Sequence, residues 1–301
     1  MILVTAAFGH QGKLLVPKLA AAGYRVRAVR ATAGKDEELT RLGASEVFIG
    51  DLSDVSTYSR ALEGVDAVYH IGPAGLPTEK QMGFAMIEAA KRAGVRHVVF
   101  SSLLHPIVDI LQHRYKRDIE EVLIESGLHF TVLKPCDFMM REVYVEIPMR
   151  TGEYPVYWSE NPRRLHSVIA MEDLTDVAVK VLREGPAHYF ASYELAGPDK
   201  LDSFETTRIL SRVMGREIRS VQKEPEHLMR ALWGTDNEGE EHRHRKEMFR
   251  SIVQWYSKND FIGNSNVLTW LLGRPPTSFE SFARSTYAEL MASPTAPRAS
   301  I

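Results

Sequence analysis

The stretch "ILVTAAFGHQG", residues 2–12, opens the chain with an apolar strand that runs directly into a turn containing two glycines. A dinucleotide-binding loop carries three glycines after its first strand, so that backbone N–H groups at the start of the next helix face a pyrophosphate. Gly9 would let the chain approach the phosphates, and Gly12 would let the helix pack against the strand. Ala6 stands at the first glycine position, where we expect only a tight fit that one extra methyl group still allows.

The first 135 residues alternate short apolar runs with amphipathic stretches, which is typical of a parallel sheet covered by helices. Each expected helix ends at a glycine, a residue that favours helix termination. We therefore predict an α/β fold of the Rossmann type, with a doubly wound parallel sheet. The expected strands span residues 2–5, 25–29, 45–50, 67–71, 97–102 and 130–134, and the expected helices span residues 13–23, 37–43, 55–64, 79–94 and 116–127.

The pattern loosens in the second half of the chain. We expect a Rossmann domain over residues 1–150, to which a strand and a helix return from about 165–198. A smaller, mostly helical region over 151–301 would bind the substrate or close over it as a lid. We expect the polar, proline-containing tail 293–301 to be disordered.

The composition of the chain narrows the choice of partners. The 301 residues are 44% hydrophobic and 25% charged, with a net charge of -2, so no basic excess points to nucleic acid. The single cysteine, Cys136, excludes an internal disulfide framework and fits a reducing compartment. No leader-like stretch opens the chain, and no apolar run reaches the roughly 18 residues of a membrane span. We expect a cytoplasmic protein without a membrane partner.

The end of the second expected strand indicates which dinucleotide the loop would bind. An NAD site places Asp or Glu there for the ribose 2′-hydroxyl, whereas an NADP site places Arg there for the 2′-phosphate. The strand ends with Arg30, Lys35 follows, and no acidic residue occurs before Asp36. Asp51, after the third strand, could accept a hydrogen bond from the adenine amino group. These residues predict NADP(H), with a solvated Arg30 as the alternative.

The sequence resembles the NmrA-like branch of the atypical short-chain dehydrogenases/reductases, above all its NADPH-sensing and isoflavone-reductase-like members. The resemblance covers about residues 1–220 and returns near the C-terminus. The stretches that carry it are "FGHQG" (8–12), "VRAVR" (26–30), "GDLSD" (50–54), "AGVRHVVFSS" (93–102), "LKPCDFMM" (133–140), "HSVIAMEDLTDVA" (166–178) and "NSNVLTWLLGRPPTSFESFA" (264–283).

The resemblance implies an NADP(H) site built from several loops that follow the strands. The predicted cofactor-binding residues are Thr5, Gly9, His10, Gln11, Gly12, Arg30, Lys35, Asp51, Leu52, Gly72, Pro73, Lys116, Pro135, Cys136 and Phe138.

The catalytic residues are harder to assign. Ordinary short-chain dehydrogenases use Tyr-x-x-x-Lys, in which the tyrosine donates a proton and the lysine holds the nicotinamide ribose. Lys116 opens the expected helix, but Gln112 stands four residues earlier and has no transferable proton. His113 and Tyr115 could reach the site from a loop. Ser102 ends a strand, either orienting a substrate or only capping that strand. The predicted catalytic set is Lys116, His113, Tyr115 and Ser102.

These residues favour an NADP(H)-dependent oxidoreductase that reduces an apolar aromatic, quinone or enone-type small molecule. The alternatives are a redox-sensing regulator that binds NADP(H) without turnover and acts through a protein partner, and a non-redox cyclase or isomerase. A homodimer is compatible with either role. The stretch "GEEHRHRKEMFR" (239–250) contains histidines, but their spacing favours a solvated helix, and we predict no metal site.

Overall fold

The computed structural model describes residues 1–224, 227, 229 and 239–292. Its centre is a parallel seven-stranded sheet with the strand order β10-β6-β5-β4-β1-β2-β3. The order reverses between β1 and β4, which opens a crevice at the carboxyl ends of the strands. The predicted doubly wound sheet is thereby confirmed. Its strands are β1 (Ile2–Val4), β2 (Val26–Arg30), β3 (Glu46–Ile49), β4 (Ala67–Ile71), β5 (His97–Ser101), β6 (Phe130–Pro135) and β10 (Ala191–Leu195).

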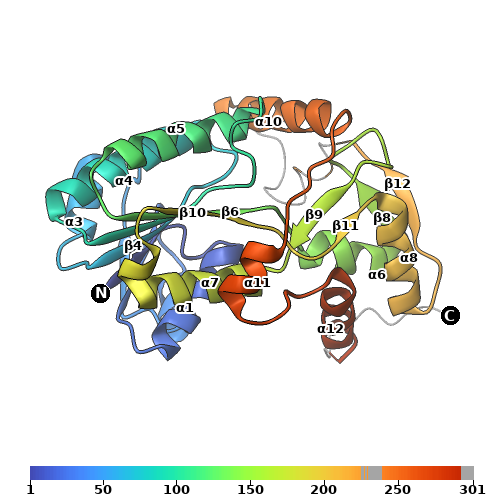
Figure 1. Ribbon diagram of the computed structural model, residues 1–301, viewed down its shortest axis with the longest axis horizontal. Coiled ribbons are helices and arrows are strands. Elements are labelled where there is room, and N and C mark those ends of the chain that lie inside the picture. Colours follow the sequence, from blue (N-terminus) through green and yellow to red (C-terminus); the bar gives the residue numbers. More distant parts are fainter. Residues whose placement is uncertain (225–226, 228, 230–238, 293–301) are drawn as a thin grey trace.

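Helices cover both faces of this sheet (Figure 1). On one face lie α3 (Val55–Ala61), α4 (Glu79–Ala93) and α5 (Leu111–Glu125), and on the other lie α1 (His10–Ala21), α7 (Met171–Glu184) and α11 (Asn266–Leu272). The short α2 (Asp36–Arg41) follows β2. Successive residues of β1 belong to different cores, because side chains alternate across a strand: Leu3 packs with the α3–α5 layer, and Ile2 and Val4 pack with the α1–α7 layer.

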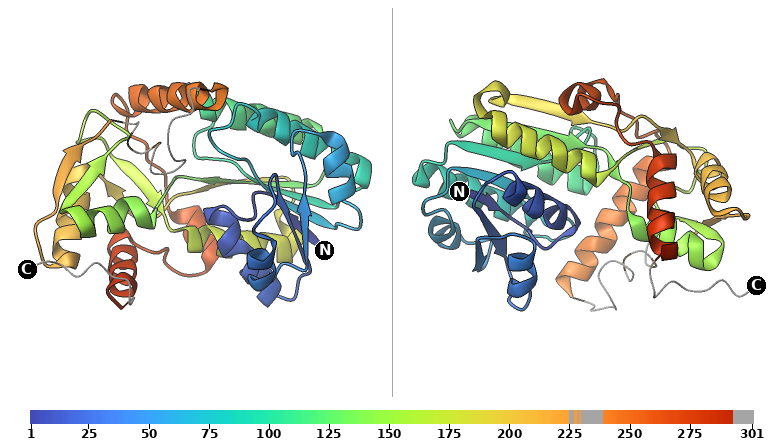
Figure 2. Two further views of the ribbon diagram at one scale, coloured as in Figure 1. Left: turned by 180° about the vertical axis from the view of Figure 1, so that it is seen from behind. Right: turned by 90° about the horizontal axis from the view of Figure 1, so that it is seen from below.

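The C-terminal region contains more β-structure than the sequence predicted. Two small sheets form there, one with the order β11-β9-β7 and one that pairs β12 with β8. Their strands are β7 (Asp137–Phe138), β8 (Glu153–Val156), β9 (His166–Ile169), β11 (Lys200–Leu201) and β12 (Arg219–Gln222). The described helices of this region include α6 (Ile147–Thr151), α8 (Ser203–Met214), α10 (Glu240–Tyr256) and α12 (Phe279–Ala292). Figure 2 shows α8, α12 and these sheets gathered at the end of the molecule opposite the N-terminus.

The predicted return of residues 165–198 to the Rossmann domain is correct for α7 and β10. α7 packs against α1, and β10 adds to the edge of the main sheet. β9 instead joins the small sheet, where it pairs with β7 and β11. The expected disordered tail, 293–301, lies outside the described residues.

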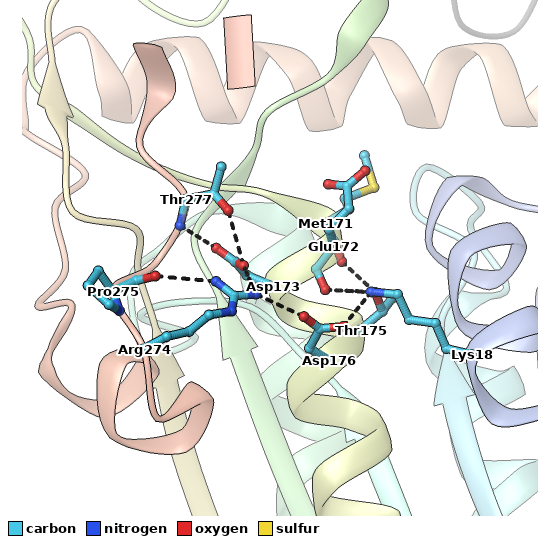
Figure 3. Close-up of polar contacts among 9 residues, drawn as sticks. All are labelled: Lys18, Met171, Glu172, Asp173, Thr175, Asp176, Arg274, Pro275 and Thr277. Atoms are coloured by element: carbon cyan, nitrogen blue, oxygen red, sulfur yellow. Dashed lines mark hydrogen bonds and ion pairs between the residues drawn. The ribbon is translucent and has the colours of Figure 1, made fainter. Parts of the chain in front are cut away.

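A buried carboxylate on α7 fastens the segment after α11 to the Rossmann domain (Figure 3). Asp173 accepts hydrogen bonds from the Arg274 guanidinium at 2.8 Å and from the Thr277 backbone N–H at 2.7 Å. Arg274 also bonds Asp176 at 2.9 Å, and the α1 residue Lys18 bonds the other oxygen of Asp176 at 2.6 Å. The network therefore joins α1, α7 and the C-terminal segment at one point.

Among the described residues, no helix has both the length and the apolar character needed to cross a bilayer.

Candidate cofactor and substrate site

The loop after β1 has the backbone of a phosphate-binding turn, although it lacks the first glycine. Ala6 has a φ of 45°, in the left-handed region that L-residues disfavour. The prediction that this position needs only room is wrong, because its backbone conformation is the one that glycine adopts freely. Gly9 is the N-cap of α1, and a Cβ on Gly12 would lie 2.5 Å from the Ala7 carbonyl oxygen. Gly12 therefore allows α1 to pack closely against the loop that follows β1.

Three cations surround the ring of Phe8 beside this loop. The Lys13 ammonium lies 3.8 Å from the ring centroid, the Arg30 guanidinium carbon 4.9 Å and the Lys35 ammonium 5.6 Å. The two lysines are partly neutralised by Glu38, at 3.8 Å from Lys13 and 3.7 Å from Lys35. Arg30 differs, because its Nη1 is buried and finds no hydrogen-bond partner among the described residues. A buried donor without an acceptor is costly, so this atom suits an anion that the protein itself does not provide.

Asp51 and Leu52 follow β3 at the same edge of the sheet. Asp51 is exposed, and hydrogen bonds from the Ser53 hydroxyl and backbone N–H to its Oδ1 lower its pKa. Its second oxygen remains available to an adenine amino group. Leu52 is buried in the α3–α5 core and can offer only its backbone.

Thr5, His10 and Gln11 occupy three different environments. Thr5 is fully buried, and its hydroxyl bonds the backbone of Ile71, so it joins β1 to the end of β4. His10 is exposed, and its pKa is raised chiefly by the Glu142 carboxylate, 3.7 Å away. Gln11 lines a cavity between the Rossmann domain and the C-terminal region, and it donates to the hydroxyl of Ser101 at 3.1 Å.

Lys116 lies in a buried ion pair that the sequence did not predict. Its Nζ is 2.8 Å from Oε1 of Glu79, the first residue of α4, and 3.4 Å from the Ser101 carbonyl oxygen. A Cβ on Gly72 would lie 2.7 Å from this Nζ and 2.8 Å from Glu79 Oε1. Because Gly72 has no side chain, the loop after β4 leaves room for this charged pair. Pro73 is the next residue of the same loop. Lys116 lines the cavity, where a ribose hydroxyl could reach it.

Ser102 belongs to a second buried polar chain. Its hydroxyl donates to Oε1 of Glu120 at 2.5 Å, and Lys134 lies 2.9 Å from Oε2 of Glu120. Ser102 lines the cavity and does more than cap a strand. Glu120 and Lys134 were missed, since Ser102, Glu120 and Lys134 come from three separate segments and form no recognisable sequence motif.

The helix that carries Lys116 starts earlier than predicted, at Leu111 rather than Lys116. The reason is tertiary: the Leu111 N–H at the helix start donates to the hydroxyl of Ser251 on α10, 3.2 Å away. His113 and Tyr115 consequently lie on the helix and not in a loop. His113 lines the cavity, whereas Tyr115 does not, and its ring stacks on His244 of α10 with 5.6 Å between centroids.

The tautomer of His113 follows from one hydrogen bond. Its Nδ1 lies 2.9 Å from the His105 carbonyl oxygen, and a carbonyl only accepts, so Nδ1 carries the proton. Burial lowers the pKa of His113, which favours the neutral ring. Nε2 of the neutral ring is an acceptor. His113 therefore offers a lone pair to the cavity rather than a proton.

A cavity of about 260 Å³ connects these groups to the C-terminal region. Pro135, Cys136 and Phe138, which the sequence predicted to bind the cofactor, lie in its lining. Burial raises the pKa of the Cys136 thiol, which disfavours a thiolate nucleophile. The far wall is aromatic. Its rings come from Tyr144, Trp158, Phe249, Tyr256 and Phe261.

Asp137 is the residue of this cavity that the sequence analysis passed over. It lies on β7 between Cys136 and Phe138, and its oxygens are 3.4 Å from the Tyr256 hydroxyl and 3.4 Å from Nδ1 of His166. The sequence feature that could have identified Asp137 as a site residue is its position as the acidic residue between Cys136 and Phe138. In the described part of the chain, no three His, Cys, Asp or Glu side chains are arranged to hold a metal ion.

Comparisons with known proteins agree with this architecture. A model of the NmrA-like family matches residues 1–265. The chain belongs to the NmrA-like family. An NAD(P)H azoreductase of Xenophilus azovorans is 30% identical over 288 residues, which cover 95% of this chain and 97% of that protein. A (4-alkanoyl-5-oxo-2,5-dihydrofuran-3-yl)methyl phosphate reductase of Streptomyces griseus subsp. griseus is 34% identical over 224 residues, which cover 73% of this chain and 76% of that protein.

Solved structures share the fold of this NmrA-like protein. An NADPH-dependent quinone oxidoreductase of Escherichia coli, complexed with NADPH, has a TM-score of 0.76 at 20% identity and covers 97% of this chain and 100% of its own. The negative transcriptional regulator NmrA has a TM-score of 0.77 at 19% identity and covers 96% of this chain and 95% of its own. The resemblance to the NmrA-like family that the sequence indicated is confirmed.

Proposed function

We propose that this protein is an NADP(H)-dependent reductase of an apolar aromatic, quinone or enone-type small molecule. The observation that carries the proposal is the buried Arg30 Nη1, which lacks a partner among the described residues at the place where an NADP 2′-phosphate would lie. The relatives named as NAD(P)H azoreductase and reductase support the same chemistry.

The residues present fit the cofactor. Gly9 and Gly12 shape the turn for the pyrophosphate, Arg30 would hold the 2′-phosphate, and Asp51 would accept from the adenine. Lys116, held by Glu79, would bind the nicotinamide ribose. When bound, NADPH supplies a hydride and the substrate needs one further proton.

The side chains around the cavity restrict where that proton originates. Neutral His113 presents a lone pair, and Gln112 carries no acidic proton. The Ser102 hydroxyl already donates to Glu120. Tyr115 lies outside the cavity lining, and the Tyr256 hydroxyl already donates to Asp137, so we favour water that enters the cavity as the proton donor.

The proposal is tested by following the nicotinamide absorbance of NADPH with a panel of quinones and enones. We expect oxidation of NADPH that depends on the added acceptor. The Lys116→Met variant and the charge-compensated Lys116→Met/Glu79→Gln variant should lose this activity. The control Lys91→Met, which changes an exposed lysine of α4, should retain it. Tight NADPH binding without oxidation by any acceptor would overturn the reductase and favour the redox-sensing regulator.

A further inference from the structure

The substrate end of the cavity combines aromatic walls with one carboxylate. Tyr256 and Phe261 stack with 5.0 Å between ring centroids, and Trp158 and Phe249 stack with 5.3 Å. Asp137 lies in the same lining. Aromatic faces attract cations through the ring quadrupole, and a carboxylate adds a full opposite charge.

Asp137 keeps acceptor capacity toward the cavity. A carboxylate has about four lone-pair directions, and among the described residues only Tyr256 and His166 bond this one, both at 3.4 Å and therefore at long distances. The contact with His166 is an ion pair only when that ring is protonated. The side chain of Asp137 is 32% exposed although the cavity wall around it is largely buried. The carboxylate is thus open to a ligand.

The other ionisable groups of the lining do not cancel this negative end. The Lys116 ammonium is compensated by Glu79 at 2.8 Å. His113 is in the tautomer that offers a lone pair. Burial raises the pKa of Tyr256 well above its ordinary value, so its hydroxyl stays protonated and donates to Asp137. These three groups therefore add no uncompensated positive charge that would offset the Asp137 carboxylate.

We propose that this cavity selects aromatic acceptors that carry a cationic nitrogen, which Asp137 binds from within the wall formed by Tyr256, Phe261, Trp158 and Phe249. The inference rests on the proposed reductase function and defines its substrate class. Neutral aromatic acceptors bind the same rings without the ion pair, and anionic ones meet repulsion from Asp137.

The test uses three naphthoquinones that differ only in one substituent: trimethylammoniomethyl, ethyl or sulfonatomethyl. For the unmodified chain we expect kcat/KM to fall about tenfold from the cation to the neutral compound, and further for the anion. Asp137→Asn should remove the preference for the cation, so that the ratio of kcat/KM for the cationic and the neutral quinone falls from about ten to about one. Asp109→Asn, the same charge change at a side chain that is 87% exposed, should keep the preference.

A binding measurement separates this inference from the reductase function. A naphthyl-trimethylammonium ion cannot be reduced, and its binding can be followed by quenching of tryptophan fluorescence. We expect Asp137→Asn, but not Asp109→Asn, to weaken it about tenfold. If no quinone is reduced but this loss is seen, the reductase proposal fails and the cation site stands. Equal kcat/KM for the three quinones, or Asp137→Asn lowering kcat/KM of all three alike, would overturn the cation site.

Discussion

Lys116 and Glu79 form an ion pair of 2.8 Å in which the two side chains are only 5% and 1% exposed. Each of these buried charges requires the opposite charge of its partner, because water cannot solvate either group. The two side chains differ in their access to the cavity: Lys116 belongs to the cavity lining, whereas Glu79 is buried outside that lining. Glu79 is thus a positioning residue for the group that would hold the nicotinamide ribose.

Replacing Glu79 by Gln should destabilise the protein by about 3 kcal/mol or more, because a buried ammonium loses its counter-charge. Urea unfolding measures this. Glu88→Gln, on the same helix in a pair with Arg92 where the side chains are 47% and 66% exposed, should cost less than about 1 kcal/mol. Adding Lys116→Met to Glu79→Gln should recover much of the loss. A Glu79→Gln protein as stable as the unmodified chain would contradict this account.

Ala6→Gly should leave the fold intact and raise the free energy of unfolding by up to about 1.5 kcal/mol. Relief of the left-handed alanine contributes about 1–2 kcal/mol, and the greater freedom of glycine in the unfolded chain offsets about 0.5–1 kcal/mol. Ala7→Gly is the matched control, since Ala7 is buried and has no left-handed backbone; it should lower stability. Equal losses for both variants would show that the φ of Ala6 carries no strain.

Asp173→Asn should loosen the C-terminal segment from α7. The carboxylate is 1% exposed and accepts from Arg274 and Thr277, so its loss leaves a guanidinium without its buried partner, at a cost of about 2–4 kcal/mol. Asp176→Asn, 42% exposed, should cost less than about 1 kcal/mol. Urea unfolding, with hydrogen exchange of the α12 amides, checks the pair. Equal urea midpoints for the two variants would show that Asp173 does not fasten the segment.

The sequence predicted what depends on local patterns. The alternation of apolar runs and helices is enough to predict a doubly wound parallel sheet, and the end of β2 is enough to single out Arg30. Strands such as β7 and β11 have only two residues each, too few for a periodic signal. The small sheets of the C-terminal region were therefore missed.

The candidate site was predicted less completely, because its charged pairs join distant parts of the chain. Glu79 becomes informative only once α4 and α5 pack together. The start of α5 depends on Ser251, 140 residues further on, so the helix was placed too late and His113 was assigned to a loop. Asp137 is recognised as a site residue only from its contacts with Tyr256 and His166, and no sequence motif links it to these two distant residues.

The central claim is that the loop after β1 and the end of β2 bind NADP(H), and calorimetric titration with NADPH and NADH tests it most directly. The account predicts tighter binding of NADPH than NADH to the unmodified chain. Arg30→Gln should weaken NADPH at least about tenfold, or about 1.4 kcal/mol, and leave NADH nearly unchanged, because a charge-assisted contact to the 2′-phosphate is lost. Arg25→Gln, at an exposed arginine beside β2, should match the unmodified chain. An NADPH affinity that Arg30→Gln leaves unchanged would contradict the account.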